Sequence, residues 1–249
     1  MITLYNAPQS TCSQRVRYTL NAKAQPFEEH KLDLFAGDQL KPDYLAINPN
    51  GVVPTLIHDD VTVIDSAVIV EYLDEVFPSP ALVPTAPAER AAMRAMMRFI
   101  DEVPTPAVRV PSYNLAFLPH FQAMTEAEFQ AVCDAKPLRR EFLMKMGRTG
   151  FPAAEMDEAT ARLQRGIDRM AGWLEASGGP WLMGPRLTLA DIAIMPVIVR
   201  MDDIGLATLW DSAPAVARWL GALQATPPFA PTYYYGSLLT EKYPHLANA

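Results

Sequence analysis

Cysteine and histidine are scarce in this sequence of 249 residues, which contains two of the former and four of the latter. Cys12 and Cys133 lie in different segments, and neither they nor the histidines follow a metal-ligand spacing. We therefore expect no metal site. Two free thiols are a simpler interpretation than a disulfide, and free thiols are typical of cytoplasmic proteins.

The sequence also lacks a long apolar run, a leader-like N-terminus and an excess of basic charge. No apolar segment reaches the ~18 residues of a membrane span, and the first residues show no basic stretch followed by an apolar one. The net charge of −7 argues against nucleic acid, because phosphate binding needs a basic face. We expect a cytoplasmic protein with no membrane and no nucleic-acid partner.

Proline, by contrast, is abundant and divides the chain in two. Four prolines fall within residues 78–87, and no regular element tolerates that density. Strand and helix patterns alternate before this segment, whereas only helical patterns follow it. We expect an α/β, thioredoxin-like N-terminal domain over residues 1–77, a Pro-rich linker over 78–87 and an all-α C-terminal domain over 88–249.

The N-terminal pattern is that of a β-α-β unit followed by a hairpin and a helix, and the C-terminal pattern is that of amphipathic helices. The expected N-terminal elements are a strand over 2–5, a helix over 14–24, an extended segment over 27–34, hairpin strands over 52–57 and 61–64, and a helix that opens at Asp65 and Ser66. The expected C-terminal helices cover 88–103, 125–135, 156–176, a buried central segment at 192–199, and 214–225.

The stretch Ser10-Thr11-Cys12-Ser13 places three hydroxyls and a thiol where the first strand gives way to the first helix. One such side chain commonly caps a helix by accepting from its free N–H groups. Four exceed what one cap needs, and the same N–H groups together with the helix dipole favour an anion or a thiolate. This turn is therefore the first candidate functional segment.

Two further signals lie in the same domain. Pro54 interrupts a β-rich run, so it marks either a strand edge or a cis bond that exposes the backbone of Val53 to a bound peptide. Asp65 and Ser66 open a helix, where they act as cap and dipole partner. The N–H groups at that helix start are equally suited to a carboxylate.

Four motifs in this order resemble the glutathione S-transferase superfamily, and the resemblance covers essentially the whole chain. They are Ser-Thr-Cys-Ser-Gln-Arg-Val-Arg at 10–17, Asn-Pro-Asn-Gly-Val-Val-Pro at 48–54, Ile-Asp-Ser-Ala-Val-Ile-Val-Glu-Tyr-Leu at 64–73 and Leu-Thr-Leu-Ala-Asp-Ile at 187–192. The resemblance implies that glutathione is the co-substrate. It also implies that Val53, ahead of a cis Pro54, pairs with the cysteinyl part, that Asp65 and Ser66 hold the γ-glutamyl end, and that Gln39 lies near the glycyl end.

The residue beside the glutathione sulfur stays open among Ser10, Cys12 and Ser13. The run resembles the Ser-Ser-Cys-Ser of zeta-class enzymes, which favours Ser10. Beta-class enzymes have a Cys-Ser pair at the place of Cys12 and Ser13, and bacterial β-etherases a serine that matches Ser13. A hydroxyl that donates to sulfur at a helix N-terminus lowers the thiol pKa, which is ~8.5 in a free thiol. A sulfur contact from Cys12 would shift the chemistry to thiol reduction.

Aromatic and basic side chains in the C-terminal half are candidates for the acceptor site. Tyr113, Phe117 and Phe121 recur every four residues and share a helix face, which fits a pocket wall, together with the tail at Tyr233–Tyr235, or ordinary core packing. Residues 136–148 carry five basic side chains and one acid. We interpret them as a solvated helix face, and the alternative is a patch that attracts an acidic ligand.

The sequence is therefore interpreted as a homodimeric, cytoplasmic glutathione transferase that detoxifies a small hydrophobic, aromatic electrophile. The segment 136–158 resembles β-etherase-type transferases of lignin-degrading bacteria, so glutathione-dependent ether cleavage stays open. Isomerisation, Cys-based thiol reduction and a non-catalytic glutathione-binding scaffold stay open as well. The hairpin at 56–64 and the helix around Met93 and Met97 are the candidates for the dimer interface.

Overall fold

The apolar run after Met1 forms a central strand of a mixed sheet. In a computed structural model that describes residues 1–246, β1 (Ile2–Asn6) pairs in parallel with β2 (Glu28–Lys31) and antiparallel with β3 (Thr55–His58). The predicted hairpin closes with β4 (Val61–Ile64), which gives the strand order β2-β1-β3-β4. The thioredoxin-like arrangement expected for this domain is confirmed.

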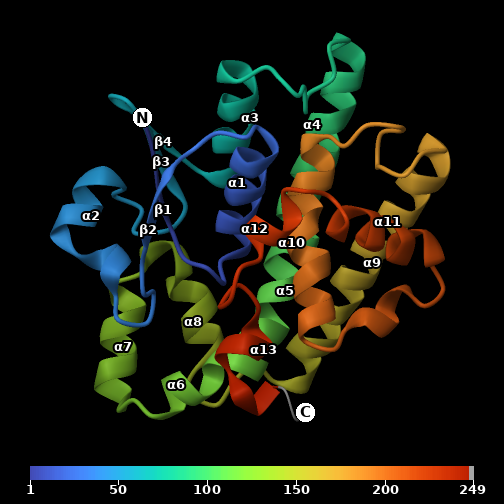
Figure 1. Ribbon diagram of the computed structural model, residues 1–249. Helices are drawn as coiled ribbons and strands as arrows, with labels where there is room; N and C mark the ends of the chain where they lie inside the picture. The colour runs from blue at the N-terminus through green and yellow to red at the C-terminus, as the bar shows by residue number, and fades with distance from the viewer. Residues whose placement is uncertain (247–249) are drawn as a thin grey trace.

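Helices cover both faces of the sheet (Figure 1). α1 (Thr11–Ala22) and α3 (Ser66–Val76) pack against each other on one face, and α2 (Pro42–Ile47) lies on the other. α1 begins three residues before the predicted start, because the Ser10 hydroxyl accepts from the Ser13 N–H at 3.3 Å and caps the helix. The expected extended segment at 27–34 is shorter than predicted, since only β2 within it pairs with another strand.

The C-terminal domain is all helical, as predicted. Its helices are α4 (Pro87–Glu102), α5 (Pro104–Ser112), α6 (Leu118–Gln122), α7 (Glu126–Asp134), α8 (Arg140–Met146), α9 (Ala153–Ser177), α10 (Leu189–Asp203), α11 (Pro214–Gln224), α12 (Phe229–Thr232) and α13 (Leu239–Lys242). A π-helical turn, η2 (Tyr113–Phe117), joins α5 to α6, and 3₁₀ turns lie at Asp38–Leu40, Pro137–Arg139, Ala207–Trp210 and Pro244–Leu246. Within residues 1–246, none of these helices has both the length and the apolar character needed to cross a membrane.

α10 is the buried centre of this domain, as its apolar composition predicts. Every residue from 189 to 201 is buried. The start of the helix is anchored by the Asp191 carboxylate, which accepts from the Thr188 N–H and hydroxyl at 2.9 and 3.0 Å. The same carboxylate accepts from the Leu182 N–H and from the indole N–H of Trp219, both at 2.9 Å. The predicted capping box is thus part of a buried four-bond network.

One hydrophobic core runs through both domains, because α10 contacts α1 and α3 as well as α4 and α5. Met93 and Met97 of α4 fill this core, as expected for methionine. Their burial takes both side chains out of the expected dimer interface, and Leu56 in the hairpin is fully buried as well. The interface prediction is wrong for these three residues.

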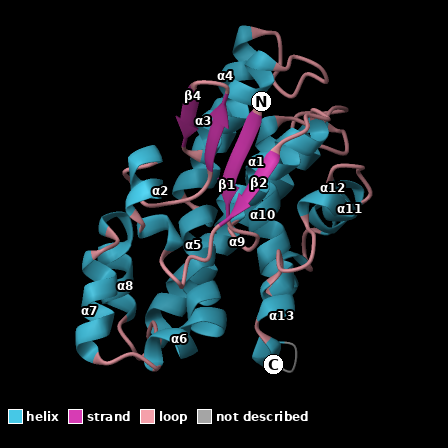
Figure 2. Cartoon of the chain, turned by 60° about the vertical axis from the view of Figure 1, so that its left-hand side comes forward, coloured by secondary structure: helices cyan, strands magenta, loops and turns pink. Residues whose placement is uncertain are grey.

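α6, α7 and α8 form a lobe at the sheet's lower end, with a second hydrophobic cluster that includes Phe117, Phe121 and the buried, free Cys133 (Figure 2). Asn114 ties this lobe to the start of α9, since its amide donates to the Phe151 C=O at 2.9 Å and accepts from the Phe151 N–H at 2.7 Å. The lobe therefore has a fixed position beside the end of α5.

Candidate active site

Two cavities meet beside the start of α1. One is a groove of about 860 Å³ that runs along the Val53 turn and the start of α3 toward α4 and α5. The other is a cavity of about 170 Å³ lined by the loop after β2, the end of α5 and the lobe. Cys12, Val53 and Arg109 line both, so the two spaces adjoin at the turn that the sequence singles out.

The groove is lined by the backbone of Val53, which precedes a cis peptide bond to Pro54. The preceding C=O, that of Val52, is fixed because it accepts from the Tyr44 hydroxyl at 2.6 Å and the Asn48 amide at 2.9 Å. The N–H and C=O of Val53 itself make no hydrogen bond with another residue in the described part of the chain. Free backbone groups just before the start of a strand are suited to pair with an extended peptide.

Asp65 and Ser66 line the same groove at the start of α3. Asp65 has a φ of 73°, a conformation that costs a residue other than glycine about 1–3 kcal/mol and that is concentrated at functional sites. Its carboxylate caps α3 by accepting from the Ala67 N–H at 2.8 Å and the Val68 N–H at 3.3 Å. Ser66 is buried, and the guanidinium of Arg15 lies 3.5 Å from its hydroxyl.

The three candidate sulfur contacts do not share one environment. Ser10 lines the smaller cavity and Cys12 lines both spaces. Ser13 is fully buried, its hydroxyl accepts from the Ala7 N–H at 3.4 Å, and it lines neither space. Thr11, which we did not select from the sequence, lines the smaller cavity beside Ser10. Ser10 and Cys12 therefore line the cavities, whereas Ser13 lines neither of them.

The loop between β1 and α1 is fixed by buried cations that the sequence analysis did not single out. Arg17 donates to the C=O groups of Ala7 and Pro8 at 3.3 and 2.9 Å, and Arg200 of α10 donates to that of Gln9 at 2.7 Å. Burial lowers the pKa of both guanidinium groups, although an arginine in a protein stays charged. Three consecutive carbonyls before the turn are thereby held in place. An arginine within an otherwise buried helix is the one sequence signal that pointed here.

Aromatic rings wall the smaller cavity. Tyr113, Phe117 and Phe121 line it, together with Phe35 from the loop after β2. Phe35 was not selected from the sequence; its ring centroid lies 5.2 Å from that of Phe117 and 6.3 Å from that of Phe121. Phe117 and Phe121 also belong to the lobe's hydrophobic cluster, so both sequence interpretations of this face hold at once.

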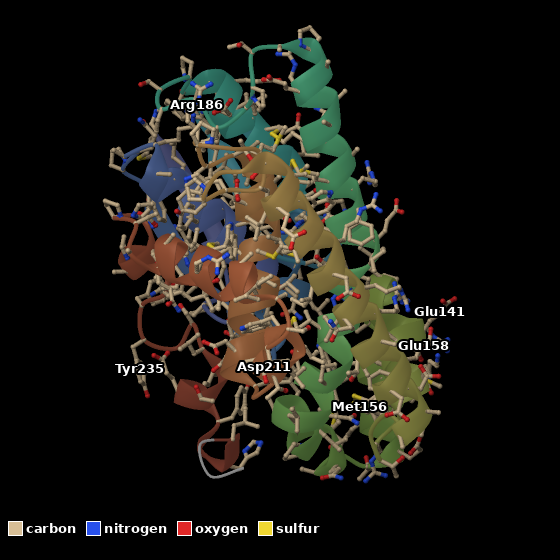
Figure 3. All side chains as sticks on the ribbon, turned by 90° about the vertical axis from the view of Figure 1, so that its right-hand side faces the viewer. Glu141, Met156, Glu158, Arg186, Asp211 and Tyr235 are labelled. Carbon is tan, nitrogen blue, oxygen red and sulfur yellow. The ribbon has the colours of Figure 1, made fainter. Side chains whose placement is uncertain are left out.

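The tyrosine tail lies elsewhere, contrary to expectation. Tyr234 packs its ring 4.8 Å from the guanidinium of Arg17, and Tyr233 is half-buried behind the same loop. Tyr235 is 82% exposed and projects from the chain at the lower left of Figure 3. None of the three lines either cavity, because this part of the tail lies beside α12, which packs against α1.

The basic segment at 136–148 is split between two environments. Arg140, Lys145 and Arg148 point away from the cavity and pair with Asp134, Glu155 and Glu126. Lys136 and Arg139 line the smaller cavity instead. The interpretation as a solvated face therefore applies to three of the five cations.

Two family models match the chain. Residues 4–81 match the N-terminal domain of glutathione S-transferase, and residues 155–222 match the C-terminal domain of glutathione S-transferase. The chain belongs to the glutathione S-transferase superfamily. As a member of this superfamily it uses glutathione as co-substrate.

Relatives of this chain within the superfamily have different names. The chain is 29% identical to Glutathione S-transferase 1 of Dianthus caryophyllus over 79% of this chain and 75% of that protein. It is 27% identical to maleylacetoacetate isomerase maiA of Aspergillus fumigatus over 82% of this chain and 79% of that protein. It is 28% identical to Protein LigF of Sphingobium sp. over 91% of this chain and 90% of that protein. The crystal structure of β-etherase LigF matches with a TM-score of 0.84 at 26% identity, over 93% of this chain and 98% of that one. The names of these relatives denote a transferase, an isomerase and an etherase, so they do not point to one reaction.

The residues of the groove fit glutathione, a tripeptide with a carboxylate at each end. Val53 offers an unpaired N–H and C=O to its central residue. At the start of α3 the Ala67 and Val68 N–H groups are bound to Asp65, so the Asp65 carboxylate and the Ser66 N–H are the groups that suit an amino-acid end such as the γ-glutamyl one. In the adjoining smaller cavity, the side-chain oxygen of Gln39 is buried and has no hydrogen-bond donor among the described residues, so a ligand N–H would satisfy it.

Proposed function

We propose that this protein is a glutathione transferase whose bound thiolate attacks a small hydrophobic, aromatic electrophile. The observation that carries the proposal is the position of the Ser10–Cys12 turn, where a peptide-sized groove adjoins a cavity walled by aromatic rings. Glutathione supplies the nucleophilic sulfur, a carbon–sulfur bond forms, and the leaving group departs with the electron pair of the bond that breaks.

Ser10 is the residue that we assign to the sulfur. Its oxygen accepts from the Ser13 N–H, so its own O–H stays available as a donor. The first N–H groups of α1 have no partner within the helix and add partial positive charge at the same point. Both effects favour a thiolate over a thiol, and they lower the pKa of a sulfur held there. We place Cys12 beside the sulfur and assign it no role in the attack of the glutathione thiolate on the electrophile.

Cleavage of aryl ethers is the second candidate. It is favoured by the likeness to LigF, which extends over nearly the full length of both chains. In that reaction the sulfur bonds to the carbon that bears the ether oxygen, and the carbon–oxygen bond breaks. The phenolate that leaves takes a proton from water.

We also propose that the enzyme is a cytoplasmic homodimer that serves in detoxification. Val61 of β4 and Val68 of α3 are 49% and 55% exposed, and such apolar side chains on neighbouring elements support a partner surface. Light scattering at micromolar protein is expected to give the mass of two chains. The mass of a single chain would contradict this part of the proposal.

The test is retention on glutathione–agarose followed by incubation with glutathione and three electrophiles. These are 1-chloro-2,4-dinitrobenzene, a β-aryl ether and a maleyl-substituted diketo acid, with products separated by liquid chromatography, which also resolves isomers of equal mass. We expect retention and a glutathione conjugate of the chloroarene, or a released phenol if the second candidate is right. A folded protein that is retained but converts none of the three would be a binding scaffold. A folded protein that is not retained would refute the proposal.

A further inference from the structure

The smaller cavity has an uneven charge lining. Arg109, Lys136, Arg139 and Arg200 line it, and no aspartate or glutamate among the described residues does. The adjoining groove is different, because its cations are accompanied by acids that include Asp65, Glu71 and Asp101. The excess of positive charge is therefore specific to the space walled by the aromatic rings.

Of the four basic side chains around this cavity, one has an anionic partner and three do not. Arg200 lies 3.6 Å from Asp203 and also donates to a backbone carbonyl. Among residues 1–246, no carboxylate lies within 4.0 Å of Arg109, Lys136 or Arg139. Arg139 bonds only to the C=O of the residue before it, at 3.1 Å.

These three cations are half-buried, not solvated. Burial lowers the pKa of the Lys136 ammonium and of the Arg109 guanidinium, and Arg139 adds to the effect on Arg109. Withdrawing a charge from water without a counter-charge is costly, whereas an anion brought among three such groups removes that cost. Like-charged side chains gathered around one cavity are thus arranged for an anionic ligand.

Glutathione alone does not balance these three cations. Under the proposed function its γ-glutamyl carboxylate meets the start of α3, and its glycyl carboxylate lies near Gln39, which lines the aromatic cavity as Lys136 does. One glycyl carboxylate leaves an excess of positive charge among Arg109, Lys136 and Arg139. The remaining positive charge is available to an anion on the second substrate.

We propose that the second substrate is an aromatic acid, whose ring lies among Phe35, Tyr113 and Phe117 and whose carboxylate binds Lys136 and Arg139. This inference rests on the proposed function. It narrows the substrate class from aromatic electrophiles in general to those that carry a carboxylate. A guanidinium and an ammonium that line the same cavity can give a carboxylate charge-assisted hydrogen bonds that a neutral substrate does not receive.

Three S-substituted glutathiones test the inference, because each spans the groove and the cavity. They are S-benzylglutathione, S-(4-carboxybenzyl)glutathione and its neutral amide, S-(4-carbamoylbenzyl)glutathione. Isothermal titration is expected to show that the carboxylate binds about 10-fold more tightly than the amide, which corresponds to about 1.4 kcal/mol. Lys136→Gln and Arg139→Gln should abolish this preference, measured as the ratio of the carboxylate and amide affinities within each variant, while S-benzylglutathione is still bound.

Lys145→Gln is the matched control, because this lysine belongs to the same basic segment but pairs with Glu155 outside the cavity. It should keep the wild-type preference. Equal affinity for carboxylate and amide, with S-benzylglutathione still bound, would overturn the inference and leave the proposed function standing. Loss of affinity for all three ligands alike in the Lys136 and Arg139 variants would also overturn it, because those cations would then serve glutathione itself. No binding of any ligand to the wild-type protein would refute the proposed function.

Discussion

Ser10 and Ser13 are three residues apart, carry the same hydroxyl, and lie on opposite sides of the same turn. Ser10 ends the loop and lines the cavity, whereas Ser13 lies one turn into α1 and bonds back to the loop. The sequence predicts that this run matters, because hydroxyls exceed the needs of one cap. It does not predict which hydroxyl is solvent-facing, since that depends on the rotation of α1 against α10.

Other residues at the site could be predicted from the sequence to different extents. Val53, Asp65 and Ser66 belong to motifs with fixed neighbours, and the structure brings all three to one groove. Phe35 and Arg200 belong to no local pattern. They reach the cavity only because a loop and a helix from different domains meet there, which is a long-range property of the fold.

Asp65 offers a residue-scale test that separates capping from binding. Asp65→Asn keeps an oxygen that can accept from the Ala67 N–H, but it loses the charge offered to the γ-glutamyl ammonium. We expect near wild-type Tm and a KM for glutathione raised about 10-fold. Asp65→Ala loses the cap as well, so it should also destabilise the protein by about 1 kcal/mol. Unchanged KM in the asparagine variant, measured at saturating electrophile, would contradict a binding role.

At the scale of elements, periodic segments were predictable and irregular ones were not. The hairpin, α4, α9 and the buried α10 follow from apolar spacing and capping residues. The π-helical turn at Tyr113–Phe117 does not, because it depends on Pro111 and Pro119, which interrupt the helical bonding on either side, and on how the lobe packs. The short helices of the tail, α12 and α13, have four residues each, which is too few for a helix that is stable by itself.

Asp191 is the element-scale prediction, because one carboxylate holds the start of α10 to two other segments. Asp191→Ala removes four hydrogen bonds and leaves buried donors, including the Trp219 indole, without a partner. Urea unfolding should show a loss of about 3–5 kcal/mol. The control is Asp211→Ala, at an exposed residue labelled in Figure 3, with an effect within about 0.5 kcal/mol. Equal effects of the two changes would show that the network contributes nothing specific.

At the scale of the whole molecule, the segment after α11 returns to the N-terminal domain and bonds to α1. Arg17 of α1 donates to the Thr232 C=O at 3.1 and 3.0 Å, and Gln14 donates to the Ser237 C=O at 3.0 Å. These bonds fasten the helix whose N-terminus forms the site. The order of domains was predictable from proline density, but this return of the tail was not.

The stability of the protein in alkaline solution tests the contact between α1 and the segment after α11. Tyr18 of α1 bonds to the Thr226 hydroxyl at 2.9 Å, and burial raises its pKa to about 12. In the unfolded chain a tyrosine titrates near ~10. The pKa shift therefore contributes its full share of the free energy of unfolding below pH ~10. This contribution is lost as the pH rises toward 12, by up to about 1.4 kcal/mol per pH unit.

Tyr18→Phe removes this titrating group, so urea unfolding between pH ~9 and ~11 should show a shallower decline than in the wild type. Tyr235→Phe, at a residue that is 82% exposed, should leave the decline unchanged. Parallel pH profiles for the wild type and Tyr18→Phe would contradict a buried, neutral phenol at the contact between α1 and the tail.

The most direct test of the central claim is the pKa of the glutathione thiol when it is bound to the protein, followed by ultraviolet difference absorbance of the thiolate across pH. We predict a bound pKa at least about 1 unit below the ~8.5 of a free thiol in the wild type. In Ser10→Gly, which retains most of the capping energy, the pKa should return toward the free value. A wild-type pKa equal to that of free glutathione, or a low pKa that survives in Ser10→Gly and is lost in Cys12→Ala, would contradict the role assigned to Ser10.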